Sequence, residues 1–151
     1  MLSISRSDGN RSRSADEGIR RRLQKLEADL LRLLNAPVIT FDDSCRSSLP
    51  ETPGIYRIFD PAQPGETVRA GRTRTAAGGL RQRVYQNHLM GNQKGNLRSQ
   101  LVAGGVCSDV GAAKRFIRER LAVQVLVVEN PEERAWLEHF MLGVLRPKYC
   151  D

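Results

Sequence analysis

The sequence predicts an α+β protein, in which a small, mainly antiparallel sheet of three strands is flanked by helices and preceded by an extra N-terminal helix. Three observations lead to this prediction. Apolar residues recur with helical spacing across residues 16–34. Two strand-like runs within residues 54–72 are separated by the turn formers of residues 61–65. Residues 121–128 (LAVQVLVV) are rich in β-branched side chains and stop before a proline.

Residues 1–50 are expected to lie outside the main domain. Residues 1–15 are polar, basic and serine-rich without periodicity, which predicts a disordered tail. Residues 16–50 are expected to form an amphipathic helix ended by Pro37 and then a linker that holds, at most, one short strand at residues 38–41.

The apolar stripe of this helix is short. Its members alternate spacings of four and three residues: Ile19, Leu23, Leu26, Leu30 and Leu33. A stable coiled coil usually needs at least ~3 heptads, whereas this stripe covers only two. We therefore expect the helix to pack on the rest of the chain, with a homodimer through this helix as the alternative.

Residues 51–151 are expected to form one domain. After the hairpin of residues 54–60 and 67–72, the pattern predicts helices at residues 79–90, 94–103 and 111–120, the strand at 121–128 and a helix at 131–145. Asn130 is the expected cap of the last helix, because Pro131 suits the first helical position and acidic residues follow it.

The composition favours a polyanionic partner. The formal net charge is +7 and the pI is about 9.9, mostly from arginine, whose planar group suits phosphate contacts. A small basic protein with no such partner is the alternative. No apolar run approaches the ~20 residues that span a bilayer, so we expect a cytoplasmic protein without a membrane partner. The three cysteines form no C-x-x-C pair, so neither a disulfide framework nor a thiolate zinc site is indicated.

Three short segments carry the functional signal. They are Pro53-Gly54-Ile55-Tyr56, Leu80-Arg81-Gln82-Arg83, and Leu137-Glu138 followed by Arg146-Pro147-Lys148-Tyr149. In this order and at these separations they resemble the GIY-YIG nuclease superfamily, which includes the N-terminal catalytic domain of an excinuclease and the phage homing endonucleases. The resemblance covers about two-thirds of the chain. It implies a β-β-α-β-α core from Gly54 onward and the hydrolysis of DNA phosphodiester bonds.

The resemblance also implies roles for individual residues. Tyr56 would accept the proton of the attacking water, and Arg83 would hold the scissile phosphate. Arg72 would contact the same phosphate or influence Tyr56. Glu138 would bind the Mg²⁺ or Mn²⁺ cofactor. Without the resemblance, a tyrosine packed in the core and solvated arginines would be the simpler interpretations.

The pattern of the last helix gives Glu138 some independent support. On a helical wheel it flanks the apolar stripe, so its side chain should be partly buried, and a buried carboxylate needs a charged partner or a metal. Hard cations such as Mg²⁺ often take only one or two carboxylates. A surface ion pair with Arg134, one turn earlier, is the alternative.

Two departures from the family pattern concern possible accessory residues. Arg69-Ala70-Gly71 stands where the family has Tyr-Ile-Gly, so Arg69 either helps Tyr56 to ionise or marks a site that has lost activity. Asn87 occupies the position at which several branches have histidine. On an α-helix His88 would point about 140° away from Arg83, so we expect His88 to be a boundary residue without a catalytic role.

These residues lead to three functional hypotheses. The first is a metal-dependent endonuclease acting on DNA, with RNA as an alternative substrate. The second is a catalytically inactive nucleic-acid-binding module of the same fold, and the third is an interaction protein that works through residues 16–35. The basic side chains expected to contact nucleic acid are Arg81, Lys94, Arg98 and Lys148.

Overall fold

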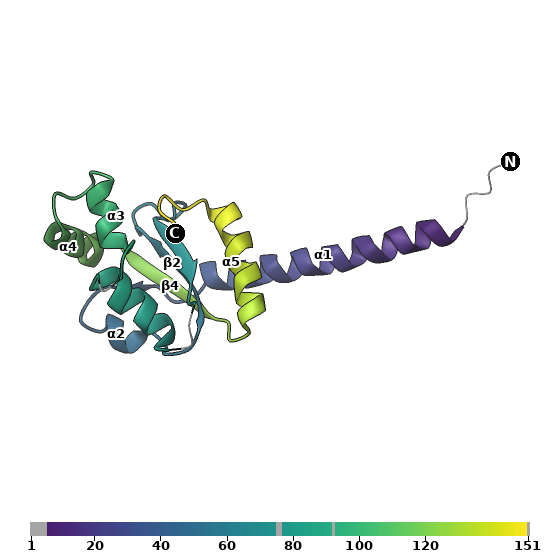
Figure 1. The fold of residues 1–151 in the computed structure, drawn as a ribbon, viewed down its shortest axis with the longest axis horizontal. Coiled ribbons are helices and arrows are strands. Elements are labelled where there is room, and N and C mark those ends of the chain that lie inside the picture. The colour runs from purple at the N-terminus through teal and green to yellow at the C-terminus, as the bar shows by residue number, and fades with distance from the viewer. Residues whose placement is uncertain (1–5, 75–76, 92, 151) are drawn as a thin grey trace.

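The computed structural model describes residues 6–74, 77–91 and 93–150 and has the predicted α+β class (Figure 1). Its elements are α1 (Arg6–Leu34), β1 (Ile39–Thr40), α2 (Cys45–Ser48), β2 (Gly54–Phe59), β3 (Arg69–Arg72), η1 (Arg81–Leu89), α3 (Leu97–Ala103), α4 (Val110–Arg120), β4 (Ala122–Val127) and α5 (Pro131–Leu145). None of the helices in the described ranges has the length and apolar character that crossing a membrane requires.

The sheet has four antiparallel strands in the order β1-β4-β2-β3, so the prediction of three strands was wrong. The additional strand is β1, which lies within the short strand allowed at residues 38–41 and pairs Ile39 with Val123 and Thr40 with Ala122. A strand of two residues is too short to show an alternating pattern, and only its partner β4 defines it. The predicted hairpin of β2 and β3 and the predicted strand β4 are confirmed.

The central strand β2 separates two apolar clusters, because successive side chains of a strand point to opposite faces. Tyr56 and Ile58 face a cluster built mainly with η1, α3 and α4. Ile55 faces a smaller cluster formed with α1 and α5. Figure 1 shows these two groups of helices on opposite sides of the sheet. A residue's position along β2 or β3 therefore decides which group of helices it meets.

Helix α1 is attached to the domain only through its C-terminal half. Leu30 and Leu33 are buried, and Gln124 Nε2 donates to the carbonyl oxygens of Leu34 at 2.8 Å and Ala36 at 3.0 Å. The N-terminal half projects away from the domain (Figure 1). It begins at Arg6, so residues 6–15 are helical where a disordered tail was expected, and residues 1–5 lie outside the described residues.

Helix α5 begins as predicted. Asn130 Oδ1 accepts hydrogen bonds from the backbone N–H groups of Glu132 and Glu133, both at 3.0 Å, and Pro131 occupies the first turn. This cap anchors the N-terminus of α5 and so positions Glu138 two turns later. The short helix α2 was not predicted from the sequence.

Gly54 begins β2 at a place where no side chain fits. A Cβ atom on this residue would lie 2.2 Å from the carbonyl oxygen of Leu126 and 2.8 Å from Leu80 Cδ1. This carbonyl group belongs to the backbone of the neighbouring strand β4, which is paired with β2 along its length. The glycine therefore allows β2, β4 and the start of the η1 segment to come together.

We predict that Gly54→Ala lowers the free energy of unfolding by about 1–3 kcal/mol, because the added methyl group overpacks the sheet. Urea denaturation followed by circular dichroism measures the loss. Gly65→Ala is the matched control, since an added Cβ there meets nothing within 4 Å, and it should change stability by less than about 0.5 kcal/mol. Equal effects of the two substitutions would contradict the packing argument.

Candidate active site at the edge of the sheet

Tyr56 lies in the middle of β2 and is fully buried, with 0% of its surface exposed. Its partner across the hairpin is Gly71 of β3. A Cβ atom at Gly71 would come within 2.8 Å of Tyr56 Oη and 3.2 Å of Tyr56 Cζ. The tyrosine ring therefore needs glycine at this position, which gives a structural reason for the glycine of the Arg69-Ala70-Gly71 segment.

A hydrogen bond of 2.7 Å joins Tyr56 Oη to His88 Nε2. The other ring nitrogen, Nδ1, accepts the backbone N–H of Leu97 at 3.1 Å. Burial, together with the nearby charges of Arg69 and Arg83, lowers the pKa of His88 well below its usual value, so the ring is neutral. A neutral imidazole that accepts at Nδ1 carries its proton on Nε2. His88 is therefore the donor and Tyr56 Oη the acceptor.

The expectation that His88 is a boundary residue was wrong, because its side chain is completely buried. The helical wheel assumed an α-helix, whereas residues 81–89 form a π-helix. In a π-helix hydrogen bonds join residues five apart, as the bond from Met90 N–H to the Tyr85 carbonyl at 3.0 Å shows. Residues 83 and 88 are five apart, so the wider turn brings His88 toward the side of Arg83. No pattern in the sequence revealed this turn.

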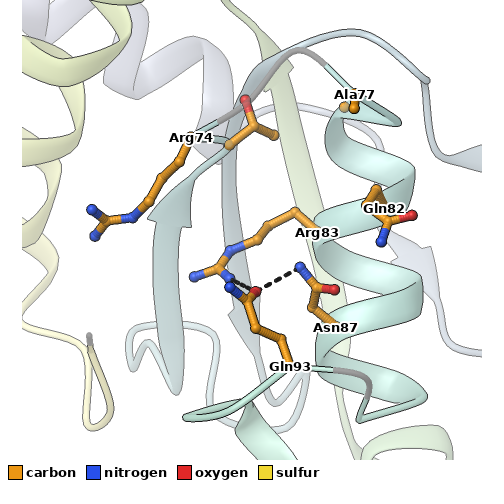
Figure 2. A pocket seen from close by; sticks show the side chains of 8 residues that line it. Arg74, Ala77, Gln82, Arg83, Asn87 and Gln93 are labelled. Atoms are coloured by element: carbon orange, nitrogen blue, oxygen red, sulfur yellow. Dashed lines mark hydrogen bonds between the residues drawn. The ribbon is translucent and has the colours of Figure 1, made fainter.

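Arg83 and Asn87 reach a common partner from η1. Arg83 Nη1 and Asn87 Nδ2 both donate to Gln93 Oε1, at 2.7 and 2.8 Å. Figure 2 shows both side chains reaching toward Gln93 beside the strands. They line a pocket of about 100 Å³ whose other lining residues are Thr73, Arg74, Ala77, Gly79 and Gln82. This pocket lies next to the end of β3 and has two arginines on its wall.

Arg69 is buried on the same face of the sheet as Gly71 and Tyr56. Its Nη1 donates to the Gly95 carbonyl at 2.8 Å and to Gln100 Oε1. At this point the C-terminal segment covers the outer edge of β3, since Tyr149 forms a parallel bridge with Arg69. Arg69 thus ties the segment before α3 to the sheet. Its charge also acts on the Tyr56–His88 pair, because it contributes to the low pKa of His88.

Arg72 and Glu138 lie on the opposite face of the sheet. Arg72 pairs with Ile55 in the β2–β3 ladder, and its Nε lies 3.3 Å from Glu138 Oε1 on α5. The Glu138 side chain is 7% exposed and that of Arg72 is 23% exposed. The predicted burial of Glu138 is confirmed. The predicted alternative, an ion pair with Arg134, is wrong.

Arg134 is used in another way. It is buried, and its guanidinium donates to the carbonyl oxygens of Thr73, Val128 and Glu129 at 3.0 to 3.1 Å. Thr73 also joins β3 to β2, since its Oγ1 accepts the backbone N–H of Gly54 at 3.1 Å. Arg134 therefore links α5 to the end of β3 and leaves Glu138 to Arg72.

The edge strand β3 divides the predicted site residues into two groups. Tyr56, Arg69, Arg83 and Asn87 lie on the side of η1, whereas Arg72 and Glu138 lie on the side of α5. Glu138 does not line the pocket around Arg83. Arg72 of one group and the pocket around Arg83 of the other both lie at the C-terminal end of β3, since Thr73 and Arg74, which follow Arg72, line that pocket.

The four basic residues expected to contact nucleic acid fall into two classes. Arg81 donates to the Leu49 carbonyl at 3.1 Å and pairs with Glu51 at 2.7 Å, and Arg98 donates to the Met90 carbonyl at 2.7 Å. These two arginines hold loops of the protein itself. Lys94 and Lys148 are exposed, with Lys148 Nζ 5.5 Å from the centre of the Tyr149 ring. Of the four, the two lysines have the accessibility that a contact with a large ligand requires.

The donor set limits which metal can bind. Across the described residues no group of three His, Cys, Asp or Glu side chains comes together. A single carboxylate such as Glu138 fits Mg²⁺ or Mn²⁺ that retains most of its waters, and does not fit a structural zinc ion. Arg72 Nε makes no hydrogen bond although it is near Glu138 Oε1, so the ion pair is loose and leaves the carboxylate able to accept another partner.

Comparison of the chain with models of protein families, with curated proteins and with solved structures found no match. The arrangement of the side chains and the resemblance of the three segments are therefore the basis for assigning a function.

The buried neutral His88 predicts a pH dependence of stability. Its folded pKa is lower than the unfolded value of about 6.5, so the unfolded chain binds a proton that the folded chain does not. We expect the contribution of His88 to the free energy of unfolding to be complete above pH ~6.5. Below this pH it should decrease by at most about 1.4 kcal/mol for each pH unit. In His88→Asn this part of the slope should disappear.

Urea denaturation between about pH 5 and pH 8 measures these slopes. His139→Asn is the matched control, since His139 is an exposed histidine on α5, and it should retain the slope of the parent protein. If the free energies of unfolding of the parent and of His88→Asn changed equally with pH, His88 would not remain neutral in the folded state.

Proposed function

We propose that the protein is a metal-dependent endonuclease that hydrolyses phosphodiester bonds of DNA. The observation that supports this function best is the hydrogen bond from His88 Nε2–H to Tyr56 Oη. A tyrosine oxygen that accepts an N–H bond is stabilised as phenolate. Its own proton must then be directed to a different acceptor, which suits a group that exchanges a proton with an attacking water.

The arginine side chains supply the positive charge that phosphoryl transfer requires. Arg83 Nη1 donates to the neutral amide oxygen of Gln93. A phosphate oxygen is a stronger acceptor for a guanidinium than an amide oxygen, so a substrate phosphate would displace Gln93 from Arg83. Arg72 approaches the same end of β3 from the other face and would neutralise charge on the phosphate or on its leaving group.

Glu138 is the residue that would hold Mg²⁺ or Mn²⁺, and the bound ion would stabilise negative charge on a phosphate oxygen. A cation held by Glu138 would share the carboxylate charge and so weaken the attraction between Glu138 and Arg72. Arg72 would then be available to the substrate. In this way the Arg72–Glu138 pair keeps a buried carboxylate neutralised until substrate and metal bind.

The second candidate function is a nucleic-acid-binding module without catalysis. Two observations favour it: Tyr56 has no exposed surface, and Glu138 is already paired with Arg72. In the nuclease, substrate binding must open a path to Tyr56 Oη, and displacement of Gln93 from Arg83 and Asn87 is the movement we propose. Both functions share DNA as partner, RNA as the alternative and the expected cytoplasmic location.

The first functional prediction concerns nicking of supercoiled plasmid DNA. With Mg²⁺ or Mn²⁺ the parent protein should nick the plasmid, and EDTA should abolish the reaction. Tyr56→Phe and Glu138→Ala should each lower the rate about 100-fold or more, because one removes the proton acceptor and the other the metal ligand. Arg115→Ala, at an exposed arginine of α4 outside the site, is the control and should retain the parent rate. Metal-dependent nicking that survives Glu138→Ala would remove Glu138 from its proposed role.

The second functional prediction separates the two meanings of Arg69. If Arg69 belongs to a working site, Arg69→Tyr should reduce nicking and stability, because it removes the buried guanidinium that holds Gly95 and Gln100. Arg69→Lys keeps the positive charge but loses the two hydrogen bonds that the guanidinium makes together. Its nicking rate and stability should therefore lie between those of the parent and those of Arg69→Tyr. An inactive parent that gains nicking in Arg69→Tyr would instead show that arginine at this position marks a lost activity.

A further inference from the structure

The part of α1 that projects from the domain and the outer side of α5 form one apolar face. Ile19 and Leu23 of α1 are 54% and 51% exposed, and Trp136 of α5 is 60% exposed. Exposed tryptophan and aliphatic side chains on adjoining elements are typical of an interaction surface. This face lies away from the pocket around Arg83.

Between α1 and α5 this face is hollowed into a groove of about 700 Å³. Its apolar wall includes Leu26, Trp136, Leu137 and Phe140, and its charged lining has both signs, with Asp29 and Glu133 beside Arg22 and Lys25. The groove thus offers an apolar floor with acidic and basic side chains beside it. An amphipathic helix whose apolar stripe is flanked by charges of both signs is the ligand that fits these features.

We propose that a second copy of this chain occupies the groove with the projecting half of its own α1. That segment has the required chemistry, since Ile19 and Leu23 form its apolar stripe and Arg20 and Arg22 flank the stripe. The two molecules would exchange these helices across a two-fold axis, so that each groove receives the partner's helix. The proposal does not depend on the nuclease activity.

An antiparallel arrangement matches the charges of the two helices. If the two-fold axis passes between Gln24 and Lys25, Arg22 lies on the same flank as the partner's Asp29, and Arg20 lies on the same flank as the partner's Glu27. The same register places Leu23 against the partner's Leu26. Asp29 is held only by exposed pairs with Lys25 at 3.3 Å and Arg32 at 3.4 Å, so it can also accept a partner's arginine.

Two α1 helices cannot pair in parallel along their whole apolar stripes. Leu30 and Leu33 are buried in the helix's own domain, so the C-terminal half of the stripe has no free side. Two heptads are also too few for an independent coiled coil. In the antiparallel arrangement the groove and Trp136 add the apolar contact that the short stripe lacks.

The test is the molar mass of the full chain in solution, measured by light scattering over a range of micromolar concentrations. We expect twice the 16.9 kDa mass of one chain. Leu23→Asp and Trp136→Ala should each raise the dissociation constant of the dimer at least about tenfold. Val110→Asp, at an exposed valine at the start of α4, is the control and should leave the dimer intact. Circular dichroism checks that each variant is folded.

Exchange of two charges tests the register. Arg22→Asp alone and Asp29→Arg alone should weaken the dimer, and the double variant should restore it, because the two residues face each other only in the antiparallel arrangement. A monomer at all concentrations would overturn the proposal, as would a dimer that Leu23→Asp leaves unchanged. Nucleic-acid binding that Leu23→Asp weakens without a change of mass would assign this face to nucleic acid and also overturn it.

Discussion

The hydrogen bond between Tyr56 and His88 connects most of the features that define this domain. It joins the central strand to η1, and it depends on Gly71, which leaves room for the tyrosine ring. It depends equally on the π-helical turn that directs His88 inward, and on the Leu97 N–H that holds the imidazole by its other nitrogen. Because His88 is buried, each of its ring nitrogens must have a partner. The tyrosine, η1 and the start of α3 are therefore positioned together.

The edge strand β3 carries an arginine side chain on each face of the sheet. Its side chains alternate, so Arg69 faces the Tyr56–His88 pair and Arg72 faces α5. The buried guanidinium of Arg69 donates to Gly95 and Gln100, which are neutral groups of the protein. Arg72 is partly exposed, and its Nε lies 3.3 Å from the Glu138 carboxylate without a hydrogen bond. The partner of Arg72 is thus a charged group that a metal would also bind, so Arg72 is the arginine whose environment a bound metal would change.

Much of the fold could be predicted from the sequence, but the decisive part of the site could not. The β2–β3 hairpin, β4 and the Asn130 cap of α5 each have a local signal that the structure confirms. The strand β1 has a weaker signal: at most one short strand was expected at residues 38–41, and the two residues of β1 within this range are defined by pairing with β4. The π-helix is likewise a property of tertiary packing: residues 81–89 have the pattern of an ordinary helix, and that interpretation turned His88 away from Arg83. The burial of Glu138 could be predicted from its place on the helical wheel. Its partner Arg72 could not, because Arg72 is 66 positions away in the chain and becomes a neighbour only when β3 and α5 come together.

Helix α1 is anchored to the domain through its C-terminal half, which leaves its projecting half suited to the proposed contact with a second molecule. Two hydrogen bonds from Gln124 and the burial of Leu30 and Leu33 hold only the C-terminal half. The other half contains Gly9, Gly18 and several serines, which are weak helix formers, and isolated helices of about 12–15 residues are marginal in water. Propensity therefore does not account for a continuous helix in this segment. Burial of Ile19 and Leu23 against a second molecule would supply the missing stabilisation, and the groove beside Trp136 provides an apolar surface suited to it.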